Sequence, residues 1–132
     1  MFQRFVAGSA IASIAIAAGA LAVVLTPALT LQKIYPLTTI WCFVPLAWGI
    51  WVLLAPATWV PERLPLWGAI LGLIAGSLAA FVLNLPSRIL GETVPGALRG
   101  VAVVIMTFFY YLMWMLVRVA WRSLASTTTE RR

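Results

Sequence analysis

Four apolar runs of about twenty residues dominate this sequence, separated by short segments that hold most of the prolines and charges. The runs cover residues 5–25, 37–55, 66–85 and 101–121. A helix rises about 1.5 Å per residue, so roughly 20 residues cross a hydrocarbon core about 30 Å thick. A membrane β-barrel would instead show segments of about ten residues with alternating hydrophobicity. The sequence therefore predicts four transmembrane helices.

The composition agrees with this prediction. The chain has 132 residues, of which 64% are hydrophobic and 9% are charged. Soluble domains carry about 25% charged residues, so this chain lacks the polar side chains to cover a surface that faces water. We therefore expect an all-α integral membrane protein, folded as a single four-helix transmembrane domain over residues 1–132.

The segments between the runs predict how the helices are connected. Pro56, Pro61 and Pro65 interrupt the segment between the second and third runs, which prevents one continuous helix. Short connections make consecutive helices antiparallel neighbours, so we expect an up-down bundle. Pro45 lies inside the second run and leaves the carbonyl of Trp41 without its helical donor, which predicts a kink.

The basic residues predict the orientation of the bundle. Three of them flank the runs on one side: Lys33, Arg88 and Arg99. Six flank the runs on the other side: Arg4, Arg63, Arg118, Arg122, Arg131 and Arg132. Basic residues accumulate on the cytoplasmic side, so we expect both termini in the cytoplasm, at a plasma or inner membrane.

A basic polar tail, residues 122–132, follows the last run. Arg118, Arg122, Arg131 and Arg132 form a juxtamembrane group, which is typical of a topology anchor or of contact with anionic lipid.

The first run has a second interpretation, as a secretory signal peptide. Arg4 would form its basic region, and residues 18–20 resemble a cleavage site. The run is 21 residues long, however, and signal sequences have shorter apolar regions of about 7–15 residues. We therefore favour a retained transmembrane helix.

Small residues gather on one face of two of the runs, at four-residue steps in the third run and as a matching surface in the first. In the third run they are Gly68, Gly72, Gly76 and Ala80, and in the first run they include Gly8, Ala12 and Gly19. Such stripes allow helix backbones to approach closely within lipid. We expect the first helix to pack on the third, and the alternative is a homodimer seam through the third helix.

Bulky residues gather near the middle of the second and fourth runs: Trp48, Trp51, Tyr110, Met113 and Trp114. Tryptophan and tyrosine normally collect at the membrane interface instead. The favoured interpretation is helix packing. The alternative is a wall for an apolar ligand such as a quinone, a carotenoid or a polycyclic lipid.

Residues that carry catalysis or bind metal are scarce. The chain has no histidine and one cysteine, Cys42, and its three acids, Glu62, Glu92 and Glu130, lie outside the apolar runs. We therefore expect no enzyme activity, no cofactor and no metal site. The basic residues are scattered among the runs, so we also expect no nucleic-acid binding.

These features predict a non-catalytic membrane protein, an accessory or scaffold subunit that binds lipids and other membrane subunits or itself. The first alternative is a module that binds a hydrophobic ligand within the bilayer. The second is a small homo-oligomeric transporter or channel. A transport path needs polar lining, and the candidates are Thr38, Thr39, Ser77 and Thr107.

Overall fold

A computed structural model describes residues 2–26 and 38–129, and these residues form helices, turns and short connections without any β-strand. The four longer helices are α1 (Phe2–Val24), α3 (Val44–Leu53), α4 (Leu64–Ser77) and α6 (Gly96–Thr129). The three short elements are η1 (Ala57–Trp59), the π-helix η2 (Leu78–Val82) and α5 (Leu85–Leu90). Three segments are long and apolar enough to cross a membrane, namely α1, α4 together with η2, and α6, whereas α3 is shorter.

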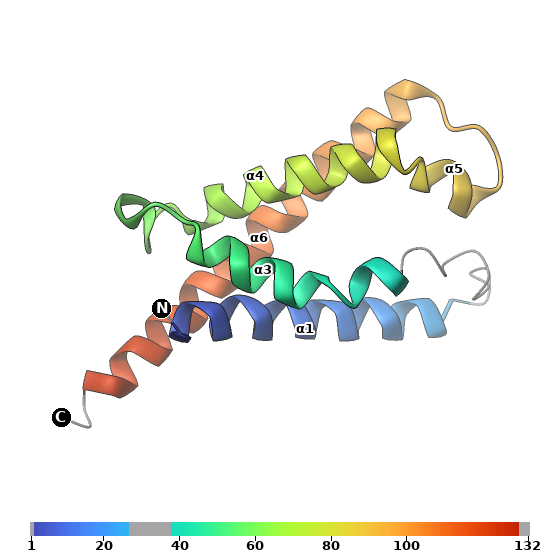
Figure 1. The fold of residues 1–132 in the computed structure, drawn as a ribbon. Coiled ribbons are helices and arrows are strands. Elements are labelled where there is room, and N and C mark those ends of the chain that lie inside the picture. Colours follow the sequence, from blue (N-terminus) through green and yellow to red (C-terminus); the bar gives the residue numbers. More distant parts are fainter. Residues whose placement is uncertain (1, 27–37, 130–132) are drawn as a thin grey trace.

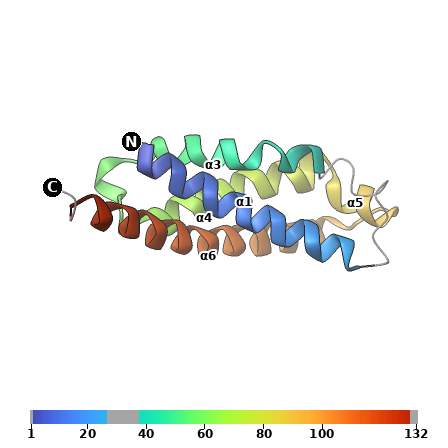
Figure 2. The same ribbon diagram turned by 90° about the horizontal axis from the view of Figure 1, so that it is seen from below.

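The helices pack as two pairs that lie against each other. α1 packs on α3, α4 packs on α6, and α6 also contacts α1 (Figure 1). Within each pair the two helices run in opposite directions (Figure 2). Both views place the start of α1 and the end of α6 at the same end of the molecule, with α5 at the opposite end. We call these the terminal end and the α5 end.

The second apolar run differs from the predicted continuous helix. Residues 38–41 are helical, Cys42 and Phe43 form a turn, and α3 begins at Val44. Pro45 therefore lies in the first turn of α3, where its missing N–H removes no helical hydrogen bond. The proline marks a break between two helical pieces rather than a kink inside one helix.

The fourth apolar run also differs from its prediction, since α6 extends beyond residues 101–121 at both ends. The tail expected from residue 122 is helical as far as Thr129. Between Val101 and Thr129 the sequence holds neither proline nor glycine, so no residue stops the helix where its apolar part ends.

The third apolar run ends through an irregular turn. The backbone widens into η2 after Ser77, and Asn84 then adopts a left-handed conformation with φ 51°. Asparagine tolerates this conformation better than most residues. It redirects the chain into α5, whose first turn contains Pro86.

The core lies where the two helix pairs meet. Its buried members include Ala7 and Ala12 of α1, Trp48 of α3, and Trp114 and Val117 of α6. Trp114 is the largest fully buried side chain, and no charged side chain is buried among the described residues. Large apolar side chains remain exposed along the outer faces of all four longer helices, which suits a surface that meets lipid or another chain better than one that meets water.

Candidate functional site

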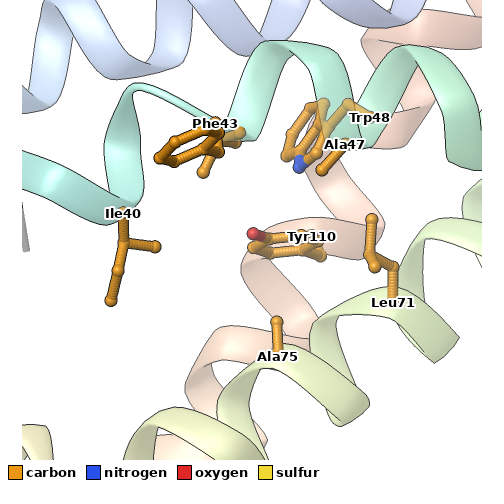
Figure 3. A pocket seen from close by; sticks show the side chains of 8 residues that line it. Ile40, Phe43, Ala47, Trp48, Leu71, Ala75 and Tyr110 are labelled. Carbon is orange, nitrogen blue, oxygen red and sulfur yellow. The ribbon is translucent and has the colours of Figure 1, made fainter.

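A cavity of about 200 Å³ opens between α3, α4 and α6 (Figure 3). Its lining comes from all three helices and from the residues just before α3: Ile40, Phe43, Val44, Ala47, Trp48, Leu71, Ala75 and Tyr110. The lining is apolar apart from the tips of Trp48 and Tyr110. Figure 3 shows the hydroxyl oxygen of Tyr110 on the side of Ile40 and Phe43, both of which are exposed.

Trp48 and Tyr110 form the inner wall of this cavity. Their ring centroids lie 5.1 Å apart with the planes tilted by 60°. Trp48 is 2% exposed, and its indole nitrogen interacts with the Tyr110 side chain without reaching the geometry of a well-formed hydrogen bond. Figure 3 shows that nitrogen on the side of Trp48 that faces Tyr110. Buried N–H groups normally have a well-placed acceptor, so this wall has a donor that Tyr110 satisfies only poorly.

The predicted ligand wall is brought together only in part. Trp114 packs behind Trp48 with their centroids 5.8 Å apart, and Met113 packs on the same core without lining the cavity. Trp51 is directed elsewhere, because its ring stacks on Trp67.

Sequence reasoning missed the outer lining residues, chiefly Ile40, Phe43 and Leu71. The proline at position 45 was the available signal, since the break before α3 places Phe43 beside the cavity opening.

The glycine stripe of the third run packs on α6, whereas the expected partner was the first helix. A Cβ added at Gly68 would collide with Trp114, and one added at Gly72 would lie 2.7 Å from the Cβ of Tyr110. At Gly76 the nearest atom would be the Cβ of Met106 at 3.3 Å. Ala80, the next residue of the stripe, is also buried. Large α6 side chains face Gly68 and Gly72, so only glycine leaves room for them at these two positions.

The small residues of the first run pack on α3 and on the residues before it. A Cβ at Gly8 would lie 3.1 Å from the carbonyl oxygen of Trp48, and one at Gly19 would lie 3.5 Å from the ring of Trp41. Ala12 is fully buried. The first helix therefore packs through its small residues inside the molecule, but against the second run and not against the third as expected.

A second hollow, of about 430 Å³, separates α1 from the residues around the start of α3. On the α1 side it is lined by Ser13, Ile16, Ala17 and Ala20, and on the other side by Thr38, Trp41, Cys42 and Pro45. We call this the α1 groove. From Ser13 onward α1 has no buried residue among those described, whereas its first half has Ala7, Gly8 and Ala12 buried.

The polar residues considered for a transport path are not gathered in either hollow. Thr38 lines the α1 groove, whereas Thr39, Ser77 and Thr107 line neither hollow. The hydroxyl of Thr107 donates to the carbonyl of Val103 at 2.8 Å, within its own helix. Transport therefore stays a prediction from the sequence.

Arginines and tryptophans gather at the terminal end. A nitrogen of Arg122 lies 2.6 Å from a carboxylate oxygen of Glu62. Arg118 donates to the backbone carbonyl of Glu62 at 3.5 Å, and the guanidinium of Arg4 lies 5.6 Å from the ring centroid of Trp121. Arg131 and Arg132 lie outside the described residues.

The described residues contain no group of three or more histidine, cysteine, aspartate or glutamate side chains placed to hold a metal ion. No family model, no curated protein and no solved structure matches this chain. The geometry of its own residues therefore carries the functional argument.

Proposed function

We propose that this chain is an integral membrane protein with four helical crossings in an up-down arrangement. The helical residues 38–41 and α3 together form the second crossing in this proposal. Its support is the length and apolarity of three helices and the exposed apolar side chains on their outer faces. The excess of arginine at the terminal end favours a cytoplasmic location for both termini, at a plasma or inner membrane.

Within that membrane, the proposed role is a non-catalytic accessory or scaffold subunit of a larger complex. The α1 groove is the observation that carries this proposal. Its α1 side offers Ser13, Ala17 and Ala20 at helical spacing, and small side chains at such spacing let a second helix approach closely in lipid. The glycine stripe of α4 is already covered by α6, so the groove is the better candidate for a partner helix.

The test replaces Ala17 with leucine, which fills the groove without adding charge. The tagged chain is extracted gently from its own membranes, and native mass spectrometry identifies what leaves with it. We expect the unaltered chain to carry other membrane polypeptides and the Ala17→Leu variant to lose them. Val104→Leu is the matched control, since Val104 is 68% exposed on α6. Equal retention of partners by Ala17→Leu would contradict this role.

A second candidate function is the binding of an apolar ligand in the cavity beside Trp48. The poorly satisfied indole N–H supports it, because a ligand oxygen in the cavity would accept from this donor in better geometry than Tyr110 does. Sites that enclose a whole drug-sized molecule measure about 300–1,000 Å³. A cavity of about 200 Å³ suits one ring or one chain segment of a lipid whose remainder stays in the bilayer.

The ligand proposal is tested with two conservative substitutions. Trp48→Phe removes the N–H and Tyr110→Phe removes the hydroxyl, and both keep an aromatic ring in the wall. We expect the purified chain to carry one reproducible apolar compound, detected by extraction and mass spectrometry, and both variants to lose most of it. Trp59→Phe is the control outside the cavity. A compound bound equally by all of these chains would exclude the cavity as its site.

A further inference from the structure

The terminal end of the molecule carries more positive charge than its own carboxylates neutralise. Arg4, Arg63, Arg118 and Arg122 lie there, and Glu62 is the carboxylate that the described residues supply at this end. Glu92, the other described acid, lies between α5 and α6 at the opposite end. Glu62 is bound to Arg122 at 2.6 Å, so the other three guanidinium groups have no carboxylate partner among the described residues.

Arg118 is the most constrained of these groups. It makes one long hydrogen bond, from a terminal nitrogen to the carbonyl of Glu62 at 3.5 Å. Its Nε atom is buried and has no acceptor among the described residues. A guanidinium group has five N–H donors arranged as a planar fork, which matches the oxygens of a phosphate. Because Nε is buried, an external phosphate would meet the terminal nitrogens of this fork, for which the described residues supply one long hydrogen bond.

The side chains next to Arg118 are of types that are common at membrane interfaces. Trp121 follows Arg118 by three residues on α6, so the two are neighbours on the helix surface. Arg4 of α1 lies over the ring of Trp121, which joins the two helices at this point. Tryptophan is enriched at membrane interfaces, where its ring meets the headgroup level.

We propose that Arg118, together with Arg4 and Trp121, binds the phosphate of an anionic glycerophospholipid. The inference rests on the proposed membrane insertion and goes beyond the proposed subunit role. Only an anionic headgroup neutralises the excess positive charge, because the phosphate of a zwitterionic lipid carries a choline that these arginines repel. The apolar outer face of α6 on the membrane side of Arg118, with Met115 37% and Leu116 48% exposed, accommodates the acyl chains.

The experiment uses the full chain in detergent and native mass spectrometry with added lipid. Phosphatidylglycerol and phosphatidylcholine with identical acyl chains are added separately. We expect phosphatidylglycerol to be retained preferentially. Arg118→Gln should lower that preference about fivefold, the effect of one arginine near an anionic surface, and Arg4→Gln should lower it similarly. Arg88→Gln, an exposed arginine in α5 at the other end, is the matched control and should leave the preference unchanged.

Three outcomes would overturn the inference: equal retention of both lipids, an equal loss in Arg88→Gln, or displacement of phosphatidylglycerol by inorganic phosphate alone, which would identify a site for a free anion. Circular dichroism checks that each variant keeps its helices, and Arg4→Gln at the start of α1 decides the matter if Arg118→Gln does not fold. Extraction of cell membranes with alkaline carbonate separates the two proposals. Release of the chain contradicts membrane insertion, whereas retention without lipid preference contradicts only the phosphate site.

Discussion

Trp51 and Trp67 bind each other twice. The indole nitrogen of Trp51 donates to the backbone carbonyl of Trp67 at 3.0 Å, and the indole nitrogen of Trp67 donates to the carbonyl of Trp51 at 2.8 Å. Their rings are stacked, with centroids 4.8 Å apart and planes 17° apart. This reciprocal pair joins α3 to α4 next to the loop of residues 54–63. It explains why Trp51 is absent from the cavity wall.

The pair predicts a measurable loss of stability when either donor is removed. Trp51→Phe retains an aromatic ring for the stack but removes the indole N–H that donates to the Trp67 carbonyl, so we expect a loss of about 1 kcal/mol. Trp67→Phe should cost a similar amount, since the geometry is reciprocal. Thermal unfolding in detergent measures both. Trp59→Phe is the control, because Trp59 contacts Trp67 only edge to face; an equal loss there would contradict a specific role for the two hydrogen bonds.

The glycine stripe predicts a graded response to alanine. Gly68→Ala should be the most damaging, because its Cβ would meet the Cβ and ring of Trp114. Gly72→Ala should follow, since its nearest neighbours include the backbone of Thr107 at 3.1 Å. Gly76→Ala should be the least damaging of the three, since its nearest neighbour, the Cβ of Met106, would lie at 3.3 Å. Overpacking of a core typically costs about 1–3 kcal/mol, so the first two should lower the unfolding temperature clearly.

The same series tests the pairing of α4 with α6. If Gly76→Ala proved as damaging as Gly68→Ala, the packing described here would be wrong. A homodimer through this stripe predicts another result: the variants would change the oligomeric state seen by native mass spectrometry while the monomer stayed stable.

A serine hydroxyl joins α1 to the first turn of α3. The hydroxyl of Ser9 donates to the carbonyl of Pro45 at 3.0 Å, and we expect Ser9→Ala to cost about 0.6 kcal/mol, as interhelical hydrogen bonds in membranes do on average. Ser13→Ala is the matched control, since the Ser13 hydroxyl donates within α1, to the carbonyl of Ser9. Unfolding temperatures of the two variants should differ, and identical values would count against the interhelical bond.

The ion pair of Glu62 and Arg122 should contribute little to stability. Its side chains are 71% and 50% exposed, and exposed ion pairs are worth about 0–1 kcal/mol. Glu62→Gln should therefore change the unfolding temperature only slightly. The loop it anchors should open more often, so trypsin should cleave faster after the exposed Arg63. An unchanged cleavage rate would show that the Arg118 contact holds the loop by itself.

Much of the fold follows from the sequence because helices depend on local chemistry. Long apolar runs without charge form helices, and the prolines of residues 56–65 and Asn84 end them where the structure has turns. The extent of α6 was harder to predict. Apolarity marks where a helix meets lipid, whereas a helix ends only where its backbone is interrupted, and no residue between Val101 and Thr129 does that.

The sequence by itself determined that the described chain is helical, which segments are apolar, and that small and bulky residues are segregated into different runs. Only the tertiary structure decided which surfaces meet. The glycines of α4 fit α6 because Trp114 and Tyr110 fill the space that the glycines leave. Trp51 lies outside the cavity because it donates one hydrogen bond to Trp67 and accepts another from it. A stripe of small residues indicates only that another helix packs closely against it. Which helix packs there depends on the shape of the partner surface, and that surface comes from a distant part of the chain.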